Sequence, residues 1–460
     1  MRLQEIILAA AMILAVTAPA GAQTLILPAQ GSEYTVDDAT HTGSQVFSQI
    51  FVGEAGTGTL HVLDGRLVRS SVSPGTVVIG FTYLGASAPG IGVVNVLGNH
   101  SRLEAIGELG LGRSQYPGVV SVGTLNIGAG GHVRVPSMRI PSTSYPSDGF
   151  VTVSGPGSLL EVVNFVEFHP AWSTAPIVTI ETGGTMSVGT TINIPGPGPE
   201  IRLEGGTLSL TGPSAVPPPG VLVYNSGSFR FRSSQTLDGA PGFYSDAYGS
   251  PPILPGGRGL VIDGTTTLAT ALALDGGSLR TSRIAVNPAT GSVLLAGGTL
   301  TLTGEGAVID DGGDFGPDPL TVGDGAGNPA RLELRGAGSV QLGVVTVATD
   351  GVLSFGGEAL VLDSLDNSVT VTVMDATLDA RAGLVNTGSL RLARVVVEGD
   401  VSSPAGSTID VTGTVTFNGD FSGAGTFYGS GTAIFNGAFT GTATFNGTGT
   451  AVFNGPASSD

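Results

Sequence analysis

Cysteine is absent from this chain of 460 residues, which excludes disulfide bonds, thiolate metal sites and cysteine nucleophiles. Lysine is absent too, since all 18 basic residues are arginine, and 36 acidic residues outnumber them. The resulting net charge of −18 argues against nucleic acid as a partner, because nucleic-acid binding requires a basic surface. It also argues against electrostatic docking on an anionic membrane.

Charged and aromatic residues are scarce as well. Only 12% of the residues are charged, against about 25% in an ordinary soluble domain, and there is a single tryptophan. Glycine, in contrast, occurs 75 times, and 41% of the residues are hydrophobic, which is too many for a disordered chain. Abundant glycine beside valine, leucine, isoleucine and threonine predicts short β-strands joined by tight turns.

Residues 1–22 have the composition of a secretory signal peptide. Arg2 precedes an apolar stretch over residues 6–18, and the small residues AGA at 20–22 provide a cleavage site. The apolar stretch is shorter than the ~20 residues that a membrane-spanning helix needs, and no later segment is long and apolar enough to span a bilayer as a helix. We therefore expect an exported protein without a transmembrane segment, located in the extracellular space, at the cell surface or in the periplasm.

Residues 401–460 contain a repeat with a period of 18. Residues 417–434 read FNGDFSGAGTFYGSGTAI and residues 435–452 read FNGAFTGTATFNGTGTAV, so eleven of the eighteen aligned positions are identical. Alternating apolar and polar residues predict short strands, and each Asn-Gly or Tyr-Gly pair is suited to a turn with positive φ. We expect the phenylalanines to stack in an inward column and the asparagines to stack at the turns.

A longer repeat precedes this one. The segment ETGGTM at 181–186 returns as LEGGTL at 203–208, and LDGGSL at 274–279 returns as LAGGTL at 295–300. This spacing is too short for a βαβ unit. A period near 20 with strands and glycine turns predicts a parallel β-solenoid, in which each rung buries its apolar face against the next. The predicted fold is therefore all-β, a single elongated rod over residues 23–400 that continues into the short-period repeats of residues 401–460.

Two proline-rich stretches interrupt this regularity, near residues 136–200 and 212–258. Proline cannot donate a hydrogen bond to a strand ladder, so we expect irregular loops inserted into the rod at both places. Loops often carry binding residues, and Trp172, Tyr244 and Tyr248 fall within these two stretches. Connectors without a partner are the simpler interpretation.

Residues 50–135 contain segments such as GTLHV and VGTLNIGAGGHVRV, and they resemble the passenger-type repeats of bacterial autotransporter-like and PEP-CTERM-type secreted proteins. The V-x-V-x-G-x-G-S-x-L element of these repeats occurs as VTVSGPGSLL at residues 151–160. It recurs at residues 94–103 with His100 in place of the second glycine, and LTVGDGAG at 320–327 is similar to another family element. The resemblance implies a right-handed parallel β-helix exposed outside the cell, and it brings no catalytic residues.

Parallel β-helices also include polysaccharide lyases and hydrolases, whose motifs are largely missing from this sequence. The segment RVPSMR, from Arg134 to Arg139, resembles the R-x-P-x-x-R element of pectate lyases, in which an arginine can serve as the base. The companion aromatic-Ile-Asp-His element is absent, and so are the motifs of polygalacturonase-like hydrolases.

The histidines show no catalytic or metal-binding spacing. They form no H-E-x-x-H motif and no closely spaced pair, which argues against a zinc site. The spacing of the histidines does not exclude a Ser-His-Asp triad, because the members of a triad come together only in the folded chain. No G-x-S-x-G elbow supports one, however. The segment GEAGTG at residues 53–58 is similar to a phosphate-binding loop but lacks lysine, so we interpret it as a turn. The histidines are His41, His61, His100, His132 and His169.

The densest group of carboxylates lies in residues 310–327. Hard oxygen ligands this close could hold Ca²⁺, but neither the EF-hand spacing nor the Gly-Gly-x-Gly-x-Asp calcium repeat is present. A solvated acidic loop is the default interpretation. The sequence thus assigns no catalytic residue, no metal ligand and no cofactor. The carboxylates are Asp310, Asp311, Asp314, Asp318 and Asp324.

Structural repetition without a convergent set of polar residues predicts a non-catalytic exported β-solenoid, acting as a cell-surface, matrix or adhesion component. The expected partners are glycans, extracellular matrix or cell-surface components, bound through many weak contacts. The open ends of the solenoid are candidate surfaces for self-association. The alternative is a carbohydrate-active β-helix enzyme, either a polysaccharide lyase or a hydrolase, which predicts a groove with clustered arginines and carboxylates.

Overall fold

The fold is described from a computed structural model of the chain. The predicted signal peptide, residues 1–22, and Trp172 lie outside the described residues. The described residues are 24–28, 32–36, 44–54, 56–70, 76–82, 88–115, 119–141, 147–169, 176–194, 198–212, 221–240, 243–286, 290–303, 320–323, 326, 328–335, 339–348, 350–356, 359–367, 370–380 and 383–458.

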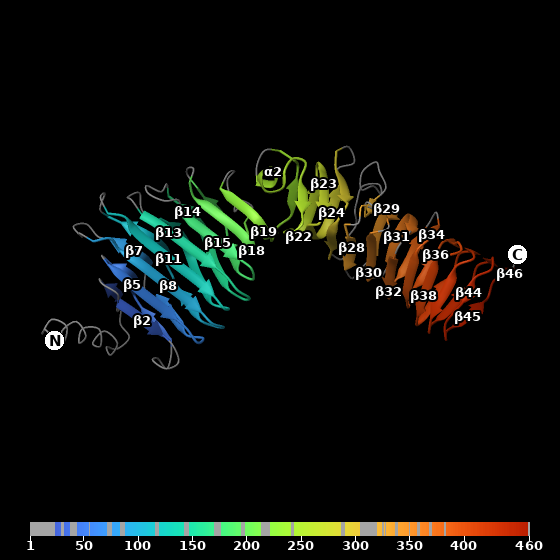
Figure 1. The fold of residues 1–460 in the computed structure, drawn as a ribbon, viewed down its shortest axis with the longest axis horizontal. Helices are drawn as coiled ribbons and strands as arrows, with labels where there is room; N and C mark the ends of the chain where they lie inside the picture. Colours follow the sequence, from blue (N-terminus) through green and yellow to red (C-terminus); the bar gives the residue numbers. More distant parts are fainter. Residues whose placement is uncertain are drawn as a thin grey trace. The chain divides into compact units, whose positions relative to one another are not determined.

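The chain divides into two compact units, unit 1 over Met1–Arg230 and unit 2 over Phe231–Asp460. Within each unit, each strand pairs in parallel with a strand one turn further along the chain, so that neighbouring strands lie side by side (Figure 1). We call one such turn a rung, and each complete rung contributes to three strand ladders. These observations confirm the predicted all-β class and the parallel β-solenoid architecture.

Unit 1 has ladders 1 to 3, and β19 (Leu222–Phe231) reaches the boundary with unit 2. Ladder 1 contains β1 (Thr24–Pro28), β4 (Gln49–Glu54), β7 (Val77–Thr82), β10 (Glu108–Ser114), the second halves of β12 (His132–Ile140) and β14 (Leu159–Phe168), and β17 (Thr191–Asn193). Ladder 2 contains β2 (Ser32–Val36), β5 (Thr57–Val62), β8 (Ile91–Leu97), β11 (Ser121–Gly128), β13 (Ser147–Val153), β15 (Ile177–Glu181) and the first half of β18 (Glu200–Leu210). Ladder 3 contains β3 (Gln45–Phe47), β6 (Leu67–Ser70), β9 (Arg102–Glu104), the first halves of β12 and β14, β16 (Thr185–Val188) and the second half of β18.

Unit 2 has ladders 4 to 6. Ladder 4 contains the first halves of β22 (Arg258–Leu268) and β24 (Ser278–Val286), then β26 (Gly298–Leu302), β28 (Ala330–Arg335), β30 (Gly351–Gly356), β32 (Thr370–Met374), β35 (Ser389–Ala393), β38 (Thr408–Thr412), β41 (Thr426–Gly429) and β44 (Thr444–Phe445). Ladder 5 contains β21 (Ile253–Pro255), β23 (Ala271–Asp275), β25 (Ser292–Leu295), β27 (Leu320–Val322), the second halves of β29 (Ser339–Val347) and β31 (Ala359–Asn367), β34 (Leu384–Asn386), β37 (Val401–Ser403), β40 (Phe421–Gly423), β43 (Phe439–Thr440) and β46 (Ala457–Ser458). Ladder 6 contains β20 (Gln235–Leu237) with the second halves of β22 and β24, and then the first halves of β29 and β31, β33 (Thr377–Ala380), β36 (Val396–Glu398), β39 (Thr414–Phe417), β42 (Thr432–Phe435) and β45 (Thr450–Phe453).

The core of each unit consists of inward columns of apolar side chains. Successive side chains of a strand point to opposite faces, so Leu125 of β11 is buried while Asn126 beside it is half-buried on the outside. The parallel register then stacks Leu125 between Val94 of β8 and Val151 of β13, both of which are buried. One rung alone could not bury these side chains, and the stack of rungs buries them as a continuous column.

Rungs are longer in unit 1 than in unit 2. In unit 1 the register pairs residue 94 with residue 125, and residue 125 with residue 151. In unit 2 it pairs residue 279 with residue 300, and residue 417 with residue 435, so these rungs use fewer positions, although the rung that pairs Leu300 with Leu332 is as long as those of unit 1. The predicted period near 20 therefore describes much of unit 2 and is too short for much of unit 1, because several connections between the unit 1 strands contain extra residues. The predicted boundary at residue 400 falls within unit 2, where β36 pairs with β39 across it.

The corner between ladders 2 and 3 explains the spacing of the V-x-V-x-G-x-G-S-x-L element. Its two copies begin at Val94 and Val151, which lie two rungs apart because both pair with the strand that contains Leu125. Ser101 and Ser158 accept hydrogen bonds from the backbone N–H groups of Gly65 and Gly130, at 3.0 and 3.1 Å. The first copy has His100 with a φ of +69°, the same left-handed region as Gly157 at the equivalent position of the second copy, at +77°, and glycine adopts this region without strain.

The C-terminal repeat stacks identical side chains, as predicted. The ring of Phe435 lies parallel to that of Phe417, with the ring centres 5.0 Å apart, and Phe439 stacks on Phe421 at the same distance. All four rings are buried. The exposed amides of Asn418, Asn436 and Asn454 form a row of hydrogen-bonded side chains, which we call the amide row. In it, Asn436 Nδ2 donates to Asn418 Oδ1 at 2.8 Å.

The glycines of the Asn-Gly pairs have a different role from the one predicted. Gly419, Gly437 and Gly455 do not have positive φ, whereas Gly429 of the Tyr-Gly pair does, at +107°. A Cβ atom on Gly437 would lie 2.3 Å from the carbonyl oxygen of Gly419 in the rung below, and the other two glycines face a backbone oxygen equally closely. Glycine is required at these positions because neighbouring rungs approach too closely for a side chain.

The proline-rich stretches contain more regular structure than predicted. Strands β12 to β18 continue through most of residues 136–200, and prolines lie at a bend such as Pro136 or between strands. Residues 212–258 contain β19, β20, β21 and the helix α2 (Phe243–Tyr248). Tyr248 of α2 is buried, and its hydroxyl donates to the carbonyl of Gly259 at 3.1 Å, so this tyrosine packs against the solenoid instead of projecting from a loop. Loop content was overestimated because proline excludes only its own N–H from a ladder.

Across the residues described above, no helix has the length and apolar character needed to cross a membrane.

Candidate functional site

The segment that resembles a pectate lyase lies at the corner where ladder 3 passes into ladder 1. The register of β12 against β14 shifts between Val135 and Ser137, and the strand turns at this point. Arg134 therefore pairs across ladder 3 with Glu104, and Arg139 pairs across ladder 1 with Gly110. Because the two arginines belong to different ladders, the structure does not bring them together as one catalytic element.

Arg134 belongs to a row of alternating charges on the outward side of ladder 3. The register places Arg69 of β6 beside Glu104 of β9, and Arg134 lies next in the row. Glu161 of β14 follows, with its Oε2 3.3 Å from Arg134 Nε. Arg69 Nε lies 3.7 Å from Glu104 Oε2. Opposite charges on adjacent strands stabilise each other by about 0.2–1 kcal/mol per pair. We call Arg69, Glu104, Arg134 and Glu161 the charged row.

A pocket of ≈ 220 Å³ lies beside the charged row, and we call it the corner pocket. Its apolar side includes Ile106 and Val163, which are 40% and 41% exposed although such side chains are usually buried. Its polar side offers guanidinium donors and a carboxylate acceptor, so it can bind hydroxyl groups next to an apolar surface. The pocket is lined on its polar side by Arg69, Glu104 and Arg134, and on its apolar side by Ala105, Ile106, Val135, Pro136 and Val163.

His132 lies in the outward row of ladder 3 next to the charged row. Its Nε2 is 3.5 Å from Glu161 Oε2 and is buried, without a hydrogen-bond partner in the described part of the chain. Burial lowers the pKa of the His132 imidazole below its usual range, and Arg102 lowers it further, while the carboxylates of Glu161 and Glu104 oppose this shift. The folded protein therefore favours the neutral imidazole.

We expect the stability of unit 1 to fall as His132 becomes protonated. The unfolded chain binds the proton near the ordinary histidine pKa of ~6.5, whereas the folded site binds it only at lower pH. The contribution to stability is therefore fully present above pH ~6.5 and is lost as the pH falls toward the folded pKa. Urea unfolding at a series of pH values should show a shallower loss of stability below neutrality in His132→Gln than in the unmodified protein. Equal pH dependence in both proteins would contradict this role for burial.

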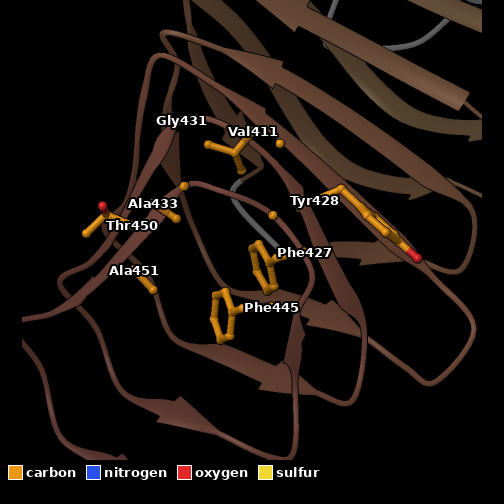
Figure 2. A pocket seen from close by; sticks show the side chains of 11 residues that line it. Val411, Phe427, Tyr428, Gly431, Ala433, Phe445, Thr450 and Ala451 are labelled. Atoms are coloured by element: carbon orange, nitrogen blue, oxygen red, sulfur yellow. The ribbon is translucent and has the colours of Figure 1, made fainter.

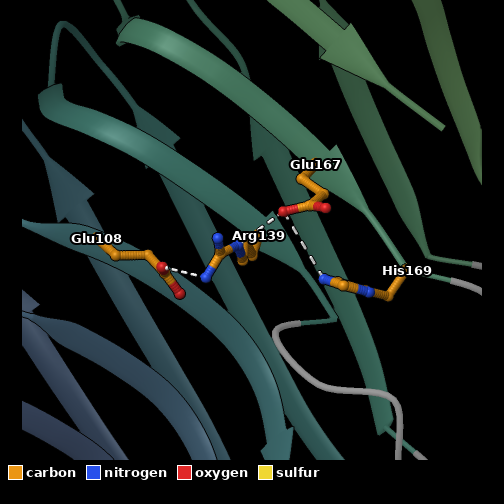
Figure 3. A network of polar contacts seen from close by, with 4 residues as sticks. All are labelled: Glu108, Arg139, Glu167 and His169. Carbon is orange, nitrogen blue, oxygen red and sulfur yellow. Dashed lines mark hydrogen bonds and ion pairs between the residues drawn. The ribbon is translucent and has the colours of Figure 1, made fainter. Parts of the chain in front are cut away.

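A second group of charges lies on ladder 1. Arg139 donates from Nη1 to Glu108 Oε2 and from Nε to Glu167 Oε2, both at 2.7 Å (Figure 3). His169 Nε2 lies 3.8 Å from the same oxygen of Glu167, and the guanidinium carbon of Arg139 lies 5.7 Å from the ring centre of Phe165. The strands β10, β12 and β14, which carry these charges, belong to successive rungs. The ion pairs therefore connect three neighbouring rungs.

The other candidates from the sequence lie apart from both groups. His61 on ladder 2 has Nε2 3.2 Å from Glu33 Oε1 and Nδ1 3.3 Å from Asn95 Nδ2. The segment GEAGTG, which is predicted to be a turn, includes the end of β4 at Glu54 and the start of β5 at Thr57. His41 and the acidic group at residues 310–324 lie outside the described residues. Within the described ranges, no three His, Asp or Glu side chains are grouped so as to hold a metal ion.

A smaller pocket of ≈ 60 Å³ lies among the C-terminal rungs of ladders 4 and 6 (Figure 2). The stacked rings of Phe427 and Phe445, with centres 4.9 Å apart, form one side, and Val411 and Ala433 lie nearby. Glycines supply much of the remaining lining, and the space exists because these residues have no side chains to fill it. It holds the volume of about two water molecules, and we interpret it as a packing gap.

Sequence reasoning identified Arg134 but missed the rest of the corner pocket. Glu104 directly follows the first copy of the V-x-V-x-G-x-G-S-x-L element, and Glu161 directly follows the second. Extending that alignment by one position beyond Leu103 and Leu160 would have matched the two carboxylates. Arg69 lies on the rung before the first copy and Arg134 on the rung between the two copies. Neither rung has a clear copy of the element, so only the strand register reveals these arginine partners.

Comparison with known protein families found no family that matches this chain, and comparison with curated proteins found no significant match. The resemblance to autotransporter-like and PEP-CTERM-type repeats therefore stays a prediction.

Proposed function

We propose that this protein is an exported, non-catalytic β-solenoid that serves as a cell-surface, matrix or adhesion component and binds extended glycans. The observation that carries the proposal is the repetition of outward hydroxyl and amide side chains in unit 2, rung after rung. One row on ladder 4 has a hydroxyl on five successive strands: Thr370, Ser389, Thr408, Thr426 and Thr444.

Two further rows run along the other ladders. Ladder 5 has an exposed hydroxyl row of Ser402, Ser422, Thr440 and Ser458. The amide row lies directly after the last three strands of ladder 6, where Asn454 Nδ2 donates to Asn436 Oδ1 at 2.8 Å, in the same way as Asn436 donates to Asn418. The amide row begins at Glu398, whose Oε1 accepts from Asn418 Nδ2 at 2.6 Å.

Such rows suit a long ligand with repeated hydroxyl groups. Strands in a ladder are ~4.8 Å apart, so each row presents a donor and an acceptor at that interval. Each contact with an exposed hydroxyl is weak, because it replaces a contact with water. A polymer that contacts several rungs at once gains affinity from the high effective concentration of each further contact. The scarcity of charge on the chain supports a neutral ligand.

Binding of the full chain to linear oligosaccharides of increasing length tests this proposal. Affinity should rise steeply with the number of sugar units, because longer chains contact more rungs. Isothermal titration calorimetry would measure the affinity, and parallel incubations would be assayed for reducing and unsaturated sugars. Affinity that does not depend on length, or no binding to glycans of any kind, would contradict the proposed binding mode.

A carbohydrate-active enzyme is the second candidate, and the corner pocket is the observation that favours it. Arginines and carboxylates lie together there beside an accessible cavity, as the enzyme alternative predicts. Time-dependent release of unsaturated sugars would support a lyase, and release of reducing sugars without unsaturation would support a hydrolase. Either result would replace the non-catalytic proposal.

A further inference from the structure

We propose that the corner pocket is a subsite for a single ring of a neutral glycan chain that runs along the rungs of unit 1. This inference rests on the proposed function and names the ligand of one site. It is drawn from the size of the pocket, from its two chemically different sides and from the balance of its charges.

The size of the pocket fits a single sugar ring. Its volume of ≈ 220 Å³ corresponds to about seven water molecules at ~30 Å³ each. Pockets for drug-sized ligands are typically ~300–1,000 Å³, so this one is too small for a large cofactor. It is open to solvent at the exposed side chains of Ile106 and Val163, which allows the rest of a chain to continue outside it.

The two sides of the pocket match the two surfaces of a pyranose. Ile106, Pro136 and Val163 occupy the same corner on three successive rungs and present an apolar surface to the C–H groups of a ring. Beside them, Arg69 and Arg134 offer donors and Glu104 offers acceptors to the hydroxyl groups at the edge of the ring. A hydrogen bond to a charged group is stronger than one between neutral groups, so these side chains supply most of the specificity.

The balance of charge favours a neutral ligand over an acidic one. The charged row contains two arginines and two glutamates in alternation, so its net charge is zero. An anionic ring held by Arg134 would lie close to the carboxylates of Glu104 and Glu161, which flank that arginine on both neighbouring strands. The net charge of −18 on the whole chain adds to this repulsion.

The direction of the ligand follows from the strand register. The charged row and the apolar corner row both run from rung to rung, parallel to each other, along the axis on which the strands stack. A chain with one apolar face and one hydroxyl edge can therefore remain in contact with both rows over several rungs. A chain lying across the rungs would leave them after a single contact.

Calorimetry with the full chain and defined oligosaccharides tests this subsite. The probes are linear neutral oligosaccharides of glucose, mannose or galactose, and oligouronates of similar length. Arg134→Gln removes the guanidinium from a side chain that is 56% exposed, so we expect the variant to fold, and its melting curve would check this. We expect affinity for the neutral chain to fall about tenfold in Arg134→Gln, and several-fold in Ile106→Ser.

The matched control is Arg202→Gln. Arg202 is 42% exposed and pairs with Glu200 on ladder 2, away from the pocket. This variant should bind like the unmodified protein. Affinity for the neutral chain should also change little between low and high salt, because no net charge is neutralised on binding.

The outcomes separate this subsite from the proposed function. Glycan binding that is equal in Arg134→Gln, Ile106→Ser and the unmodified protein would overturn the subsite and leave the proposed function standing. Preferential, salt-sensitive binding of oligouronates that Arg134→Gln abolishes would overturn the neutral ligand. Absence of binding to every glycan would overturn both proposals.

Discussion

Replacing Phe435 with aspartate should unfold the C-terminal rungs of unit 2. The Phe435 side chain is 1% exposed, and its ring stacks between those of Phe417 and Phe453, with centres 5.0 and 5.1 Å away. Its edge contacts include Phe421 and Phe439, at 5.6 and 5.0 Å. Removing a buried phenylalanine costs about 3–5 kcal/mol, and burying a carboxylate in its place costs several kcal/mol more. The total is a large share of the ~5–15 kcal/mol that stabilises a typical domain.

The loss should be local, because each rung of a solenoid contacts only its neighbours. Limited proteolysis should therefore cut first within residues 414–453, and circular dichroism should show a lower-temperature transition for part of the strand signal. The control is Thr432→Asp, which places the same charge on the outward side of the same strand, β42. A Phe435→Asp protein with the melting curve and cleavage pattern of Thr432→Asp would contradict the inward phenylalanine column.

Replacing Asn386 with leucine should cause the second-largest loss of stability among the changes proposed for this protein. Asn386 is fully buried in an inward polar ladder, where its Oδ1 accepts from Asn367 Nδ2 at 2.7 Å. Its own Nδ2 donates to Ser403 Oγ at 3.3 Å and to the carbonyl of Thr408 at 3.1 Å. Leucine has a similar size but makes none of these bonds. Each buried polar group that loses its partner costs about 1–3 kcal/mol, so we expect a loss of roughly 2–5 kcal/mol in the free energy of unfolding.

The exposed amide row provides a matched control for the buried ladder. Asn418→Leu removes the same side chain and two similar hydrogen bonds, but water can replace them, and we expect a loss below about 1 kcal/mol. The double variant Asn367→Leu/Asn386→Leu removes both amides and should be less destabilised than the sum of the single variants. Denaturant unfolding measures the unmodified protein, the three single variants Asn386→Leu, Asn367→Leu and Asn418→Leu, and the double variant. Equal stabilities for Asn386→Leu and Asn418→Leu would show that the buried ladder contributes nothing.

The repeats made the architecture predictable because, in a solenoid, residues that are one sequence period apart lie side by side on adjacent rungs. Residues at equivalent positions of the FNG repeat become neighbours on adjacent strands, as Thr432 is beside Thr414. The spacing of the Gly-Gly motifs likewise places Thr207 beside Thr185. Alternation along each strand then indicates which side chains point inward.

Close approach between rungs could not be predicted from local sequence. An Asn-Gly pair is a frequent turn signal, and this pattern predicts a positive φ for Gly437. The actual constraint on Gly437 is the carbonyl oxygen of Gly419, which belongs to the rung below. In the same way, the local sequence around Pro136 predicts a loop, whereas Pro136 occupies a bend in β12 where the register shifts against β14. Both errors come from contacts between segments on different rungs, which a local pattern does not contain.

The amino-acid sequence was sufficient to establish the class of fold and the stacking of the phenylalanines and asparagines, because a regular period and alternating polarity leave few other ways to bury the apolar side chains. The proximity of Arg69, Glu104 and Arg134, in contrast, is determined only by the tertiary structure. These residues lie on successive rungs of unequal length, and their contact depends on how many residues each connection contains. The corner pocket exists because the parallel register brings side chains from successive unequal rungs into one row, and that register is a property of the folded chain.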